Sequence, residues 1–148
     1  MTKTLVKCEN VNKMVFLSIK PEDTYNYAKD FASGIKSGAV ISLTGPLGSG
    51  KTVFVQSLAQ GLGIKAKIKS PTYILMQNHG RFYHVDAYRL ENSQALLNLG
   101  FKEILADKNN LIIIEWGDKI RDILPKDTIN INLEHIDQNK RRIEIGIK

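Results

Sequence analysis

The chain has 148 residues, 43% of them hydrophobic and 24% charged, which is typical of a globular protein that can bury one core. No apolar run approaches the roughly 20 residues that span a bilayer, and the first residues lack the apolar stretch of a secretory signal. We therefore expect one domain over residues 1–148, in the cytoplasm and away from membranes. The single cysteine excludes an internal disulfide. The net charge of +6 favours contact with polyanions.

Apolar periodicity and turn residues predict alternating strands and helices. In chain order these are strands over 4–10 and 13–19, a helix from Pro21 to Gly34 or Gly38, a strand over 39–44, a helix from Gly50 to Gly61 or Gly63, strands over 73–77 and 82–86 joined by a hairpin turn at 78–81, a helix over 93–106 that Gly100 weakens, a strand over 110–116, a short helix ended by Pro125, and an antiparallel pair over 128–136 and 141–147. We expect a three-layer α/β fold, with a mixed central sheet, helices on both faces and an antiparallel element.

Residues 45–52, GPLGSGKT, match the G-x-x-x-x-G-K-[ST] pattern of a phosphate-binding loop (P-loop), between a predicted strand and a predicted helix. The glycines let the backbone curl until successive N–H groups point into one concavity, and the helix start adds its positive dipole end. Lys51 is expected to reach the β- and γ-phosphates, and the Thr52 hydroxyl to ligate Mg²⁺. The predicted fold is therefore that of a P-loop NTPase. Its nucleotide-binding residues are expected to be Gly45, Leu47, Gly48, Ser49, Gly50, Lys51 and Thr52, with Trp116 beside them.

The run LIIIEW, residues 111–116, predicts a buried strand that ends in a carboxylate. Mg²⁺ at a P-loop needs an acid at the end of a neighbouring strand, so Glu115 is the second candidate metal ligand, directly or through water. The alternative is a strand-end carboxylate in solvent. Trp116 stands where a second acid could orient an attacking water, so we expect slow hydrolysis unless another group completes the site. No Asn-Lys-x-Asp element for guanine is found, which leaves ATP as the expected nucleotide.

Two further catalytic candidates lie between the halves of this site. Thr72 follows the P-loop at about the distance at which other P-loop switches place a Thr that senses the γ-phosphate, although residues 70–72 could equally form a turn. His84 and Asp86 share one face of a strand. Asp86 could orient water or support the metal, or it could pair with Arg89.

The segments GPLGSGKT, KSPTY, YHVDAYRL, LGF and IIEW, in this order and spacing, resemble the TsaE family (formerly YjeE) over nearly the whole chain. These bacterial ATPases serve tRNA threonylcarbamoyladenosine biosynthesis. The resemblance implies an accessory ATPase that acts with the paired proteins TsaB and TsaD, of which TsaD transfers the threonylcarbamoyl group to the adenosine beside the anticodon. Two positions depart from the family pattern: Pro46 replaces an acid, and Gly117 replaces a proline that often follows Glu-Trp.

Carried over by position, the resemblance implies that Lys51 and Thr52 serve phosphate and Mg²⁺ and that Glu115 is the other metal-side carboxylate. It places Thr72 in a switch-like loop and makes Asp86 and Trp116 necessary for activity. It also makes residues 18–24 candidates for the adenine pocket.

Two other functions and one other surface stay open from the residues alone. A small-molecule kinase usually carries an Arg-rich lid, for which residues 80–90 offer only Arg81 and Arg89. A non-catalytic switch would dock a partner in its ATP-bound form. The alternating lysines of KAKIK, residues 65–69, could face tRNA phosphates or simply guard a solvated strand edge.

Overall fold

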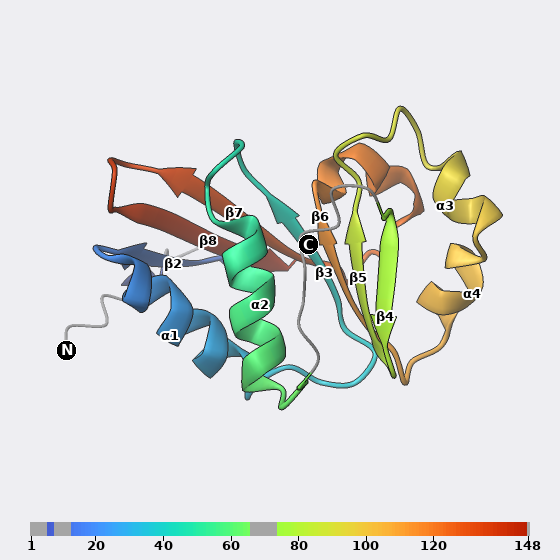
Figure 1. Cartoon of the computed structure of the whole chain (residues 1–148), viewed down its shortest axis with the longest axis horizontal. Helices are drawn as coiled ribbons and strands as arrows, with labels where there is room; N and C mark the ends of the chain where they lie inside the picture. The colour runs from blue at the N-terminus through green and yellow to red at the C-terminus, as the bar shows by residue number, and fades with distance from the viewer. Residues whose placement is uncertain (1–5, 8–12, 66–73, 148) are drawn as a thin grey trace.

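The structure, a computed structural model, describes residues 6–7, 13–65 and 74–147 (Figure 1). Its strands are β1 (Val6–Lys7), β2 (Lys13–Ser18), β3 (Val40–Thr44), β4 (Met76–His79), β5 (Phe82–Asp86), β6 (Leu111–Glu115), β7 (Ile129–His135) and β8 (Arg141–Ile147). Its helices are α1 (Pro21–Ala32), α2 (Lys51–Gly61), α3 (Gln94–Asn98), α4 (Phe101–Ala106) and the 3₁₀ helix η1 (Gly117–Ile123).

The strands within these ranges form one mixed sheet in the order β1-β2-β8-β7-β3-β6-β5-β4. The central strands β7, β3, β6 and β5 are parallel to one another, while β1, β2 and β8 on one side and β4 on the other pair antiparallel. The predicted mixed sheet, the hairpin and the antiparallel terminal pair are therefore confirmed.

Helices cover both faces of the sheet, as predicted (Figure 1). Side chains of a strand alternate between faces, so Ile41 and Ile113 pack under α1 and α2, whereas Ile112 and Ile114 pack against α3, α4 and η1. The two layers of core are thus separated by the central strands. None of the helices in the described ranges is long and apolar enough to cross a membrane.

The parallel strands bring the P-loop and two strand-end carboxylates together at the carboxyl ends of β3, β5 and β6. The P-loop follows β3 and leads into α2, while Asp86 and Glu115 end β5 and β6. Glu115 pairs in register with Leu43 on one side and with Asp86 on the other. In α/β sheets, ligands bind outside the carboxyl ends of the strands. The candidate site residues lie at these strand ends in this protein.

The helix predicted over 93–106 is wrong in one respect, because it is two short helices. Gly100 adopts φ +79° between α3 and α4, a left-handed conformation that interrupts the helical hydrogen bonds. The hairpin turn is also tighter than predicted, since β4 continues through His79 and only Gly80 and Arg81 lie between the strands. Of the first predicted strand, only Val6–Lys7 lies within the described residues.

Candidate nucleotide-binding site

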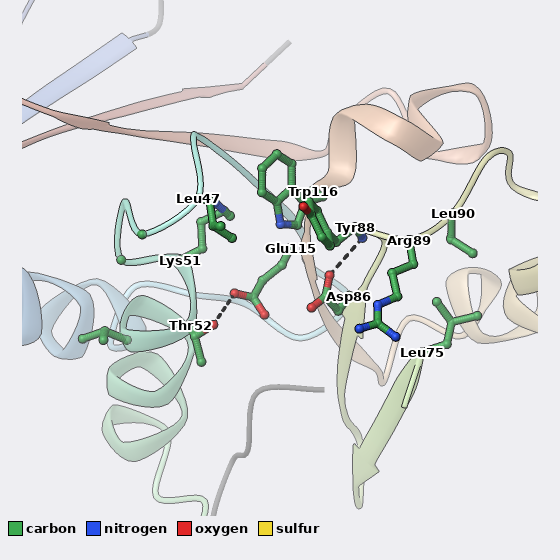
Figure 2. Close-up of a pocket in the computed structure, with 13 residues that line it drawn as sticks. Leu47, Lys51, Thr52, Leu75, Asp86, Tyr88, Arg89, Leu90, Glu115 and Trp116 are labelled. Carbon is green, nitrogen blue, oxygen red and sulfur yellow. Dashed lines mark hydrogen bonds between the residues drawn. The ribbon is translucent and has the colours of Figure 1, made fainter. Parts of the chain in front are cut away.

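A cavity of about 670 Å³ opens at the carboxyl ends of β3, β5 and β6 (Figure 2). Its walls come from the P-loop, the first turn of α2, the end of β6 and the segment after β5. The predicted site residues that line it are Leu47, Gly48, Gly50, Lys51, Thr52, Asp86, Glu115 and Trp116. Thr72 and the rest of 66–73 lie outside the described residues. Residues 18–24, the adenine candidates, do not line this cavity, and the Thr24 hydroxyl donates to Ser18 Oγ at 2.8 Å.

The P-loop has the curled shape that its glycines predict. Gly45 adopts φ +142°, and a Cβ at this position would lie 2.2 Å from the Leu133 carbonyl oxygen on β7 and 2.8 Å from Ser49 Oγ. Gly50 adopts φ +100° immediately before α2 begins at Lys51. Glycine is therefore needed at the start of the loop because the backbone of β7 approaches closely, and at its end because of the backbone turn.

Lys51 is folded back onto its own loop. Its ammonium donates to the carbonyl oxygens of Gly45 at 2.7 Å and Pro46 at 2.8 Å, and lies 4.1 Å from the centre of the Trp116 ring. Burial lowers the pKa of Lys51, and the carboxylates of Glu115, Asp86 and Asp118 oppose this shift. The ammonium is placed at the mouth of the loop, where phosphate oxygens could replace the two carbonyls.

Glu115 is buried and accepts two hydrogen bonds. The Thr52 hydroxyl donates to Oε1 at 2.7 Å, and His84 Nε2 lies 2.9 Å from Oε2 (Figure 2 draws the Thr52 bond). Adjacent ligands of an octahedral Mg²⁺ ion lie about 2.9 Å apart, from bonds of roughly 2.0–2.1 Å at right angles. The Thr52 and Glu115 oxygens have close to this spacing and both residues line the cavity, so the predicted pair fits Mg²⁺.

Asp86 lies beside Glu115 at the mouth of the same cavity. Its Oδ1 accepts the Tyr88 N–H at 2.9 Å. Burial raises the pKa of Asp86, and the Glu115 charge adds to the rise, while the Tyr88 hydrogen bond, His84 and Lys51 oppose it. A carboxyl group with a raised pKa next to a phosphate loop is suited to hold or accept a proton.

Trp116 connects the P-loop with the segment after β5. Among the described residues that are not glycine, it alone has a positive φ, of 60°. The centres of the Trp116 and Tyr88 rings lie 4.9 Å apart, and the Trp116 ring covers the Lys51 ammonium. The next residue, Gly117, packs against β3, where a Cβ would lie 1.9 Å from Ser42 Oγ. The left-handed backbone at Trp116 and the close approach at Gly117 together form a tight turn beside the cavity that Trp116 lines.

Sequence reasoning missed two members of this cluster. Strand alternation placed His84 on the face of Asp86, but gave no reason to connect it with Glu115 on another strand. Tyr88 belongs to the segment YHVDAYRL, but the pattern assigns it no role, although it lines the cavity and contacts Trp116.

A P-loop between β3 and α2, with a carboxylate at the end of the adjacent strand β6, defines a P-loop nucleotide-binding protein. Comparison with known proteins narrows this class. The sequence profile "Threonylcarbamoyl adenosine biosynthesis protein TsaE" matches residues 18–143, and the chain belongs to the TsaE family.

Relatives and a solved structure agree with this assignment. The chain is 38% identical over 129 residues to the tRNA threonylcarbamoyladenosine biosynthesis protein TsaE of Rickettsia bellii, covering 84% of this chain and 88% of that protein. It is 35% identical to the TsaE of Treponema pallidum, over 88% of this chain and 98% of that protein. The crystal structure of Bacillus subtilis YdiB superposes with a TM-score of 0.78 at 27% identity, covering 95% of this chain and 90% of that one.

Proposed function

We propose that this protein binds ATP with Mg²⁺ and hydrolyses it as an accessory protein in the threonylcarbamoyladenosine modification of tRNA beside the anticodon. The observation that carries the proposal is the Thr52–Glu115 contact at the mouth of a complete P-loop. The names of the relatives support the pathway. The proposed partners are TsaB and TsaD, the whole chain is proposed to act as one domain, and work on tRNA would place it in the cytoplasm.

Each residue of the P-loop has a proposed role in holding the nucleotide. The backbone N–H groups of the loop, to which Pro46 contributes none, and the positive end of α2 favour the phosphate chain. Lys51 exchanges its two carbonyl partners for phosphate oxygens. Thr52 and Glu115 hold Mg²⁺, which would neutralise charge on the transferred phosphate.

Hydrolysis also needs a group that orients the attacking water. Asp86 is the proposed candidate, because its carboxylate lies at the cavity mouth and burial raises its pKa. Trp116 fills the position after Glu115 with an aromatic ring, so the chain alone supplies no second acid there. We therefore propose slow turnover by the isolated protein, with Thr72 as a further proposed catalytic residue.

The proposal is tested by ATP hydrolysis in vitro and by tRNA modification in bacteria that lack their own TsaE. Lys51→Ala should abolish both, because the phosphates lose their ammonium partner, whereas Lys102→Ala, an exposed lysine on α4, should leave both unchanged.

Glu115→Gln separates a turnover-dependent ATPase from a non-catalytic switch. It should reduce hydrolysis about 100-fold or more and abolish modification in the cell. Full modification with no hydrolysis would contradict the proposed ATPase role and favour the switch.

A further inference from the structure

His84 is buried at the centre of the site, although none of the roles proposed above uses it. Its side chain is 0% exposed, that of Glu115 is 3% exposed, and Nε2 lies 2.9 Å from Oε2. We infer that His84 is a positioning residue: its ring holds the Glu115 carboxylate in the orientation that binds the Mg²⁺–nucleotide complex. The inference rests on the proposed function, because it concerns the same site.

The direction of the hydrogen bond follows from the chemistry of the partners. A carboxylate offers only acceptors, so the ring nitrogen that faces Oε2 carries the hydrogen. The other ring nitrogen, Nδ1, is buried and has no hydrogen-bond partner among the described residues. An acceptor without a partner is tolerated better than a buried N–H without one, which agrees with a hydrogen on Nε2 rather than on Nδ1.

The two donors fix the carboxylate from different elements. Thr52 on α2 donates to Oε1 and His84 on β5 donates to Oε2, while Glu115 itself ends β6. The terminal torsion of a glutamate is broad when nothing holds it, so each hydrogen bond narrows its orientation. His84 and Glu115 lie on adjacent parallel strands, which makes their spacing a property of the sheet.

The two hydrogen bonds differ once a metal is bound. Thr52 is a proposed metal ligand, so its contact with Oε1 would be shared with the ion. His84 contacts the other oxygen, Oε2, and would keep its bond, so it is the donor that orients the carboxylate independently of the metal. Hydrogen-bond partners of metal ligands commonly contribute 10–100-fold to metal affinity or activity.

The test measures the binding of a fluorescent ADP analogue with Mg²⁺ and with EDTA. The ratio of the two dissociation constants reports how much the metal tightens binding, without any turnover. His84→Phe keeps an aromatic ring of slightly larger volume but removes the donor, so we expect this ratio to fall about tenfold, with binding in EDTA unchanged. His84→Gln can place an amide N–H near Oε2, so we expect it to restore most of the ratio.

His79→Gln is the matched control. His79 lies on β4 of the same hairpin, and its Nε2 is likewise buried without a hydrogen-bond partner in the described part of the chain. We expect this variant to keep the wild-type ratio, because His79 pairs with Phe82, which lies beside Leu111 at the opposite end of β6 from Glu115.

The possible outcomes distinguish a failure of the His84 positioning role from a failure of the proposed function. A wild-type ratio in His84→Phe, or an equal loss in His84→Phe and His84→Gln, would overturn the positioning role. If Mg²⁺ does not tighten binding to the wild type, the proposed function itself is contradicted. Should thermal unfolding show that His84→Phe is not folded, His84→Asn replaces it, since its shorter amide cannot reach Glu115. Asn retaining the ratio as well as Gln would then overturn the inference.

Discussion

Asp86 combines a cost in stability with a proposed role in turnover. Burial raises its pKa, so the folded protein disfavours the ionised carboxylate. The stabilising contribution of such a group is present below its unfolded pKa and is lost as the pH rises through its folded pKa. At neutral pH, Asp86 therefore destabilises the fold, while the ionised form is the one that could accept a proton from water.

Asp86→Asn should raise Tm at pH 7 and remove most of the hydrolysis. The amide oxygen can still accept the Tyr88 N–H, and no charge is left to desolvate. Because the side chain is partly exposed and solvent screens it, we expect a gain of roughly 1–3 °C. Thermal unfolding of both proteins across pH measures it, and the difference should shrink toward acidic pH. A lower Tm for Asp86→Asn at pH 7 would contradict this account of the shift.

Trp116→Ala should spare ATP binding and impair tRNA modification. The indole stacks over Lys51 when that lysine is folded onto its loop, and nucleotide phosphates would compete for the same ammonium. We expect the Kd for ATP to change by less than about tenfold, measured by titration, and modification in cells to be lost. Leu99→Ala, which removes an exposed side chain at the end of α3 that does not line the cavity, is the control. Loss of ATP binding itself would contradict this prediction and make the Trp116 ring a contact that ATP needs.

At the scale of single residues, the residue types predicted where the site lies but not all of the contacts between its side chains. The glycines, Lys51 and Thr52 follow one motif, so their neighbourhood could be predicted. The contact of His84 with Glu115 joins two strands, and only strand order reveals it. The approach of Gly117 to Ser42, next to the left-handed Trp116, is likewise a tertiary contact that the local sequence does not reveal.

At the scale of the elements, the packing of α2 against α1 requires a close approach at Gly61. A Cβ on Gly61 would lie 2.7 Å from the Lys29 carbonyl oxygen and 2.8 Å from Ala32 Cβ. We expect Gly61→Ala to destabilise the protein by about 1–3 kcal/mol, as overpacking does in a close contact. Chemical denaturation measures the change. Gly34→Ala is the control, because its nearest contact would be 3.7 Å away, and a loss in Gly34→Ala as large as in Gly61→Ala would contradict this explanation.

Periodicity predicted most elements because their apolar faces are local features. The helix over 93–106 is the clear exception: its apolar residues continue across Gly100, but Leu96 of α3 and Phe101 of α4 reach the core from two separate helices. A helical pattern does not show where the backbone stops being helical, and Gly100 weakened the prediction without locating a break.

Across the whole molecule, the class of fold followed from the alternation of strands and helices, but the strand order did not. The N-terminal strand β2 pairs with the C-terminal strand β8, and β7 lies beside β3, which extends the sheet on one side of the P-loop. These pairings join distant parts of the chain, and periodicity carries no information on them. The position of the site at the carboxyl ends of the strands was predictable, because parallel strands all end on the same side of the sheet.

We propose that ATP turnover by this protein serves a TsaB–TsaD system. This is tested by the rate of ATP hydrolysis by the purified protein, alone and with the TsaB–TsaD pair, together with a pull-down of the pair. We predict slow hydrolysis by the isolated chain, binding of the pair and a changed rate in its presence. An equal rate with and without the pair, and no binding, would contradict the account.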